Sequence, residues 1–167
     1  MDRWFTKKIS SSISIRLAEP KDKAKILSVF GSYGLKWEKK SAKVYYDDYF
    51  SSSASLKGDT VYVAVLNNKI IGITGYSIDR YETDNYWLSW FYIHKQYSRK
   101  GYGKQLIDFI IRELKKKRIK RLFVNTSSYP FYEGALHFYL KCGFKIEATI
   151  KDYYWKGVDQ IILSKQL

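Results

Sequence analysis

The chain has 167 residues, of which 46% are hydrophobic and 18% aromatic, and its formal net charge is +14. The apolar content excludes an intrinsically disordered chain, and no apolar run approaches the roughly 20 residues that a transmembrane helix needs. The excess of positive charge indicates an anionic ligand or partner, for which a nucleic acid, a membrane surface and a polyphosphate cofactor are the candidates.

The N-terminal residues and the single cysteine limit the setting of the protein. Residues 1–12 lack the apolar stretch of a signal peptide, and they predict an exposed leader ahead of one domain, residues 13–167. Cys142 is the only cysteine, which excludes a disulfide within the chain and a cysteine-based metal site. We therefore expect a cytoplasmic protein that uses no metal.

Strands are predicted where β-branched and aromatic residues alternate or run without a break. These segments are residues 13–17, 60–66, 70–78, 86–93, 121–125, 145–149 and 158–165. The polar triplet at 67–69 is typical of the turn of a hairpin. The run at 86–93 is almost continuously apolar, which indicates a central strand covered on both faces.

Helices are predicted where apolar residues recur every three or four positions. Such patterns cover residues 20–30, start at Lys104, and cover residues 135–141. Residues 35–58 are ambiguous, with a candidate helix at 44–50. A front half rich in hairpins, followed by two strand–helix units, predicts a mixed sheet with helices on both faces.

A basic turn lies between the apolar strand and the long amphipathic helix. Residues 97–104 read Tyr-Ser-Arg-Lys-Gly-Tyr-Gly-Lys. The first main-chain N–H groups of a helix have no intrahelical partner, and they attract anions. The two glycines let a phosphate approach the backbone, and the three basic side chains add positive charge. The turn is therefore predicted to bind a pyrophosphate.

Four motifs resemble the GNAT-type acetyl-CoA-dependent N-acetyltransferases, and together they span residues 13–165. The turn, residues 98–103, is similar to the family pattern Arg/Gln-x-x-Gly-x-Gly/Ala, and it follows an apolar strand that ends Phe-Tyr-Ile at 91–93. Residues 135–144, ALHFYLKCGF, resemble the family segment Ala-x-x-Phe-Tyr-x-x-x-Gly-Phe. Residues 152–163 resemble the closing hairpin of many members. The order and spacing of the four carry the resemblance, since a short Gly-x-Gly pattern alone is weak.

The resemblance implies an α/β (α+β) fold, with a mostly antiparallel sheet of about six or seven strands between layers of about four helices. It also implies an N-acetyltransferase in which a neutral primary amine attacks acetyl-CoA directly, in a ternary complex. The cofactor-binding residues that it implies are Phe91, Tyr92, Ile93, Ser98, Arg99, Lys100, Gly101, Tyr102, Gly103, Lys104, Asn125, Tyr132 and Phe138.

Two positions depart from the family pattern. Ser98 takes the place of the Arg or Gln that opens the turn, with Arg99 one residue late, and Tyr132 takes the place of a frequent Asn. Neither change removes a main-chain donor. We therefore expect the nitrogens from Gly101 to Lys104 to hold the pyrophosphate more than any one side chain does.

Tyr139 lies where the family carries the proton donor to the leaving sulfur. A phenol with an ordinary pKa of about 10 is protonated at neutral pH and can donate as thiolate charge develops. The alternative is an amphipathic core aromatic. The sequence does not identify the base that deprotonates the amine. The candidate acids Glu82, Asp84 and Glu133 are typical of solvated surface acids, and His94 and His137 are typical of structural positions.

The acceptor is a small-molecule or peptide amine, and Trp37 and Tyr154 are the candidate residues that bind it. The rival hypothesis is a basic module that binds nucleic acid or the ribosome through residues 112–121, which hold seven basic residues and one acid. The simpler interpretation of that run is a solvated helix end, so nucleic acid is not favoured. The expected assembly is a monomer or a homodimer.

Overall fold

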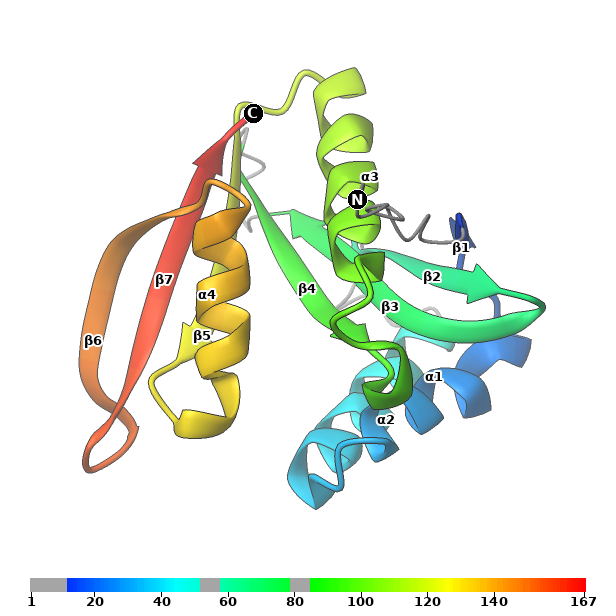
Figure 1. Cartoon of the computed structure of the whole chain (residues 1–167), viewed down its shortest axis with the longest axis horizontal. Helices are drawn as coiled ribbons and strands as arrows, with labels where there is room; N and C mark the ends of the chain where they lie inside the picture. Colours follow the sequence, from blue (N-terminus) through cyan, green and yellow to red (C-terminus); the bar gives the residue numbers. More distant parts are fainter. Residues whose placement is uncertain (1–11, 52–57, 79–84) are drawn as a thin grey trace, which may run out of the picture.

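The structure, a computed structural model, describes residues 12–51, 58–78 and 85–167, and these form one seven-stranded sheet with helices on both faces (Figure 1). The strands are β1 (Ser14–Leu17), β2 (Thr60–Leu66), β3 (Lys69–Ile78), β4 (Asn85–Ile93), β5 (Arg121–Ser127), β6 (Lys145–Trp155) and β7 (Val158–Gln166). Their order is β1-β2-β3-β4-β5-β7-β6, and every neighbouring pair is antiparallel except β4 and β5. The predicted mixed, mostly antiparallel sheet is confirmed.

Four α-helices lie in the described part of the chain. They are α1 (Lys23–Gly31), α2 (Lys36–Phe50), α3 (Tyr102–Lys116) and α4 (Glu133–Lys141), and the short 3-10 turns η1 (Pro20–Asp22), η3 (Lys95–Tyr97) and η4 (Pro130–Tyr132) precede α1, α3 and α4. Helix α2 is longer than the candidate at 44–50, because its first two turns are too polar to show an apolar stripe. The predicted leader, residues 1–12, lies outside the described residues apart from position 12.

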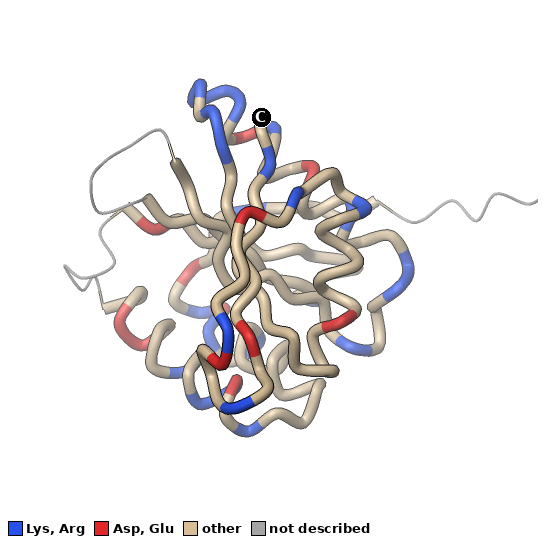
Figure 2. Tube along the Cα trace, turned by 90° about the vertical axis from the view of Figure 1, so that its left-hand side faces the viewer, with Lys and Arg blue, Asp and Glu red and all other residues tan. Residues whose placement is uncertain are grey.

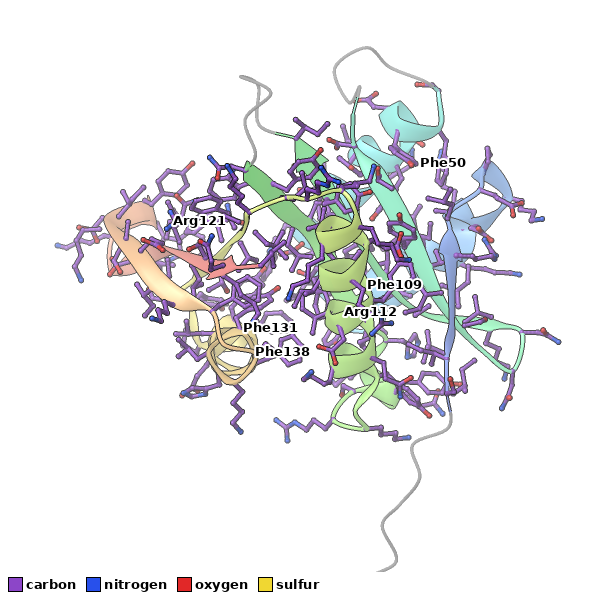
Figure 3. The ribbon with its side chains drawn as sticks, turned by 90° about the horizontal axis from the view of Figure 1, so that it is seen from above. Phe50, Phe109, Arg112, Arg121, Phe131 and Phe138 are labelled. Carbon is purple, nitrogen blue, oxygen red and sulfur yellow. The ribbon has the colours of Figure 1, made fainter. Side chains whose placement is uncertain are left out.

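The helices cover the two faces of the sheet in pairs, which confirms the three-layer arrangement (Figures 1 and 3). Helices α1 and α2 pack on one face, where Phe30 and Tyr46 are buried with Ile73 of β3. Helices α3 and α4 cover the opposite face, where Ile110 and Tyr139 join a second buried cluster. The apolar run of β4 lies between these layers, as the sequence predicted for a central strand.

Strand β4 carries a bulge that sets the geometry of the site. Opposite Thr74 of β3 it places two residues, Trp90 and Phe91, where regular pairing would place one. Trp90 has a φ of 46°, in the left-handed region, and its ring packs into the α1–α2 layer. A bulge increases the twist of a strand. β4 and β5 pair only between Asn85–Trp87 and Arg121–Phe123, and they diverge beyond that point. We call the region beyond this pairing the β4–β5 fork.

Candidate active site

The β4–β5 fork leaves one edge of β4 with no strand partner, among the described residues, from Leu88 onward. Main-chain groups along this edge can pair with an extended ligand, in the manner of an added strand. Asn125 lies on the other arm of the fork, where β5 pairs with β7 alone, and its side chain is exposed. The carbonyl of Ile93 accepts a hydrogen bond of 2.5 Å from the Tyr33 hydroxyl.

The basic turn forms the N-terminus of α3, as the sequence predicted. Gly101 caps the helix with a φ of 86°, a conformation that favours glycine. The first intrahelical bond runs from the Gln105 N–H to the Gly101 carbonyl at 3.2 Å. The N–H groups of Gly103 and Lys104 precede that bond, in the first turn of the helix, where main-chain donors lack intrahelical acceptors. Donors of this kind, at the positive end of a helix dipole, can bind an anion.

The side chains of this turn are mostly occupied within the protein. The Ser98 hydroxyl donates to the Lys95 carbonyl at 2.8 Å, and the Tyr102 ring is buried in the core. The Lys104 ammonium forms an ion pair with Asp108, one helical turn later. The Lys100 ammonium lies 5.6 Å from the centre of the Tyr97 ring. The turn can therefore offer main-chain nitrogens to an anion more readily than it offers side-chain charges.

The structure brings four sequence-predicted residues together beside this turn. A side chain on Gly103 would contact the Phe138 ring at 3.5 Å and the Phe91 ring at 3.8 Å. The rings of Phe91 and Phe138 stack with their centroids 5.4 Å apart, and the Tyr139 ring lies 6.1 Å from Phe91. The helix N-terminus, the bulged strand and α4 thus come together around these rings.

Tyr139 is 5% exposed, between Phe91, Phe138 and Phe144. Burial raises the pKa of its phenol well above the ordinary value, because a phenolate would lose solvation there. The hydroxyl therefore stays protonated throughout the neutral range. The ring is part of the core, as one of the two sequence-based interpretations has it, and its role as a proton donor stays a prediction.

A second cluster lies on the α1–α2 side of β4. The Tyr132 hydroxyl donates a hydrogen bond to the Glu38 carboxylate, which joins η4 to the first turn of α2. The Tyr92 hydroxyl interacts with both Glu38 and Tyr132, and the Trp37 side chain hydrogen-bonds to Tyr132. Burial, followed by the neighbouring Glu38 charge, raises the pKa values of Tyr92 and Tyr132.

Sequence reasoning missed Glu38, since in the stretch Lys36-Trp37-Glu38-Lys39-Lys40 it resembles a solvated acid among lysines. Of the acids considered as a base, Glu82 and Asp84 lie outside the described residues, and Glu133 is exposed. His137 is exposed, and the Nδ1 atom of His94 accepts a bond from the Gln96 N–H at 3.2 Å.

The two predicted acceptor residues lie in different surroundings. Trp37 joins the Glu38 cluster, although its side chain is 52% exposed. Tyr154 lies on β6, and the centroid of its ring lies 4.9 Å from that of Tyr153 and 6.2 Å from that of Trp155. Its role in acceptor binding stays a prediction, as does the cofactor role of Tyr132.

Other features of the molecule bear on the function classes that the sequence left open. Within residues 12–51, 58–78 and 85–167, every helix is too short or too polar to cross a membrane, and no three His, Cys, Asp or Glu side chains form a metal site. A shallow depression of about 580 Å³ lies between α1, Lys39 and His94, and none of the predicted site residues lines it. Lys and Arg are spread around the trace, with one group in the loop between α3 and β5 (Figure 2).

Comparisons with known proteins agree with this geometry. Residues 26–144 match the model of a family described as the acetyltransferase (GNAT) family. A search of curated proteins gave no match. Among solved structures, a GNAT-family acetyltransferase from Desulfovibrio desulfuricans has a TM-score of 0.85 at 23% identity, covering 93% of this chain and 99% of that one.

Two further structures share the fold. The ribosomal-protein-S18-alanine N-acetyltransferase from Escherichia coli has a TM-score of 0.73 at 18% identity, with 93% of this chain and 94% of that chain covered. The PaiA N-acetyltransferase from Thermoplasma acidophilum, solved with coenzyme A, has a TM-score of 0.71 at 22% identity, with 93% and 99% covered. These structures show the fold. The family model spans more than half of the sequence, and the chain therefore belongs to the GNAT acetyltransferase family.

Proposed function

We propose that this protein transfers the acetyl group of acetyl-CoA to a primary amine in a ternary complex. One observation carries the proposal. Gly103 at the N-terminus of α3 faces the rings of Phe91, on the unpaired edge of β4, and Phe138, beside Tyr139. This juxtaposition supports an anion-binding role for the helix N-terminus, a ligand-pairing role for the strand edge and a proton-donor role for Tyr139.

The residues present fit acetyl-CoA. The N–H groups of Gly103 and Lys104 would bind the pyrophosphate, and a Cβ at position 103 would face the Phe138 and Phe91 rings at ordinary van der Waals distance. The edge of β4 from Phe91 to Ile93 would pair with the amides of the pantetheine arm. Bound acetyl-CoA supplies an acetyl group on a thioester, which an amine converts into an amide and a free thiol.

The protein would assist by placing hydrogen-bond donors and a proton. A main-chain N–H at the bulge, near Phe91, would donate to the thioester carbonyl oxygen and stabilise the charge that develops on it. The Oη atom of Tyr139 would hold the proton that the leaving sulfur takes. Its raised pKa keeps this proton in place until thiolate charge appears.

Calorimetry and a free-thiol assay test the proposal. We expect micromolar binding of acetyl-CoA, thiol release that depends on an added amine, and weak binding of a generic oligonucleotide that disappears with added salt. Tight, salt-resistant oligonucleotide binding without acetyl-CoA binding would instead support the basic binding module.

A further inference from the structure

We infer that Glu38 and the aromatic side chains around it bind the acceptor as an ammonium ion, that Glu38 takes its proton, and that the preferred acceptors are arylalkyl primary amines without a neighbouring carboxylate. The inference rests on the proposed function, since it names the acceptor of the same site. It assigns a role to the cluster that joins α2, β4 and η4.

Glu38 differs in its partner from six other acids of the described residues. Many described carboxylates pair with Lys or Arg, namely Glu19, Asp22, Asp47, Asp108, Glu113 and Asp159. Glu38 is half-buried and lies between lysines in sequence, yet its hydrogen bond comes from the phenol of Tyr132, 94 residues away. No ion pair reaches it within the described residues. A phenol leaves the negative charge of the carboxylate uncompensated, so the site retains its attraction for a cation.

Aromatic rings surround this carboxylate. The Tyr33 ring lies 6.0 Å from Tyr92 and 5.8 Å from Phe131, and Phe131 lies 5.0 Å from Tyr132. Aromatic faces attract ammonium groups by cation–π interaction, and a carboxylate among them adds a full opposite charge. The Trp37 and Phe131 side chains beside this cluster are 52% and 38% exposed. They therefore offer apolar surface that the aromatic part of an acceptor can cover.

The cluster and the proposed proton donor lie on opposite faces of β4, beside neighbouring residues of the strand. Phe91, which contacts Tyr139, and Tyr92, which contacts Glu38, are consecutive residues of β4 and point to opposite faces of the strand. An amine held at Glu38 would therefore have to reach a thioester held near Phe91 through the β4–β5 fork, where the two strands do not pair.

Glu38 is the group in this cluster that can accept a proton. The titratable groups that face it are Tyr92 from β4 and Tyr132 from η4, and the raised pKa values of both keep them neutral. Of the three protons of the ammonium, one passes to Glu38 and then to solvent, and one replaces the proton that Tyr139 gives to sulfur. The third stays on the amide nitrogen, as the N–C bond forms and the C–S bond breaks.

Three matched acceptors test the substrate class. Phenethylamine has the favoured arrangement, phenylalanine adds a carboxylate beside the amine, and phenylalaninamide replaces that charge with a neutral amide. We expect kcat/KM for phenethylamine to exceed that for phenylalanine about tenfold, which corresponds to about 1.4 kcal/mol. The reason is that the Glu38 carboxylate repels the carboxylate of phenylalanine. Phenylalaninamide should lie close to phenethylamine.

Variants at Glu38 test its role. Glu38→Gln should lower kcat/KM for phenethylamine about 100-fold, the usual contribution of a general base, and reduce the preference over phenylalanine to within about threefold. The loss should shrink near pH 10, where the amine is neutral without help. Glu38→Asp should restore part of the preference. Asp48→Asn, which changes an exposed acid of the same helix, is the matched control and should leave every constant unchanged.

The outcomes separate the two proposals. Wild-type protein that fails to bind acetyl-CoA by calorimetry would contradict the proposed function. If it binds acetyl-CoA but does not acetylate phenethylamine, or prefers phenylalanine, the acceptor class is wrong. If Glu38→Gln matches Asp48→Asn in rate, preference and pH dependence, Glu38 has no part in the reaction. Unchanged acetyl-CoA affinity of Glu38→Gln would show that the variant is folded.

Discussion

Two groups of residues beside the β4–β5 fork are built from different parts of the chain. We call the turn at the N-terminus of α3 the α3 end of the fork, and the cluster around Glu38 the Glu38 end. The α3 end uses the main chain of one short segment, residues 101–104, in which the Tyr102 ring is buried and the Lys104 ammonium pairs with Asp108. The Glu38 end uses side chains from three elements, with Glu38 on α2, Tyr92 on β4 and Tyr132 in η4. A main-chain site depends on the shape of a turn, whereas a side-chain site depends on the packing of distant elements.

This difference predicts how each end responds to substitution. Most side chains of the α3 turn can change without loss, provided that the turn keeps its path and remains open to a phosphate. At the Glu38 end a single atom matters, because one carboxylate supplies all of the charge. The substitutions below test this contrast in order of decreasing effect.

Gly103→Glu should have the largest effect. The new side chain would meet the rings of Phe138 and Phe91 and place a negative charge among the N–H groups that are proposed to bind the pyrophosphate. Loss of two charge-assisted hydrogen bonds of about 2 kcal/mol each would weaken acetyl-CoA binding about 1000-fold in calorimetry. Gly134→Glu is the matched control, since this glycine in the first turn of α4 has open space around it. Equal affinities for the two variants would show that the ligand binds elsewhere.

Tyr139→Phe should act on turnover alone. Removal of the proton donor should lower kcat about 100-fold at an unchanged acetyl-CoA dissociation constant, measured by thiol release and calorimetry. Because burial raises the pKa of Tyr139, the wild-type kcat should show no loss from this group up to about pH 10.

Tyr46→Phe is the control for this substitution. The Tyr46 hydroxyl is buried with no hydrogen-bond partner among the described residues, so its removal should leave kcat intact and cost no stability. A Tyr139→Phe enzyme as fast as Tyr46→Phe would reduce Tyr139 to a core residue.

The same contrast explains what could be predicted from the sequence. The turn at 97–104, the helix that follows it and the segment at 135–144 are local patterns, so the fold and the family could be inferred. The bulge could not, because Trp90 and Phe91 continue an apolar run and their register depends on Thr74 in another strand. Glu38 could not be distinguished either, since its hydrogen bond to Tyr132 forms only when α2 and η4 come together.

Asp22→Asn should weaken the layer that carries Glu38 without changing either end of the fork. Asp22 is buried, accepts bonds of 2.6 and 2.9 Å from Arg16, and accepts the Glu19 N–H at 2.9 Å. We expect the free energy of unfolding at pH 7 to fall by about 2 kcal/mol in urea titrations. The kinetic constants at 25 °C should stay within twofold.

The pH dependence of this effect has a definite sign. Hydrogen bonds from Arg16 lower the pKa of Asp22. Its contribution is therefore complete above the ordinary carboxyl pKa of about 3.9, and it is lost as the pH falls from there through the lowered folded value. The gap between wild type and Asp22→Asn should narrow over that range. A gap that stays constant would mean that Asp22 stabilises the fold by packing and not by charge.

The smallest effect is expected at Lys104, although it is a basic side chain in the middle of the proposed phosphate site. Its ammonium is paired with Asp108, and an exposed pair of this kind contributes about 0–1 kcal/mol. Lys104→Ala should therefore weaken acetyl-CoA binding less than about threefold, whereas Asp108→Ala, which frees the ammonium, should strengthen it by up to about threefold. Opposite signs at these two positions, both far below the effect of Gly103→Glu, would establish a site built from the main chain. A loss at Lys104→Ala that approaches the Gly103→Glu loss would instead show that one side chain holds the phosphate, and the two ends of the fork would then be built alike.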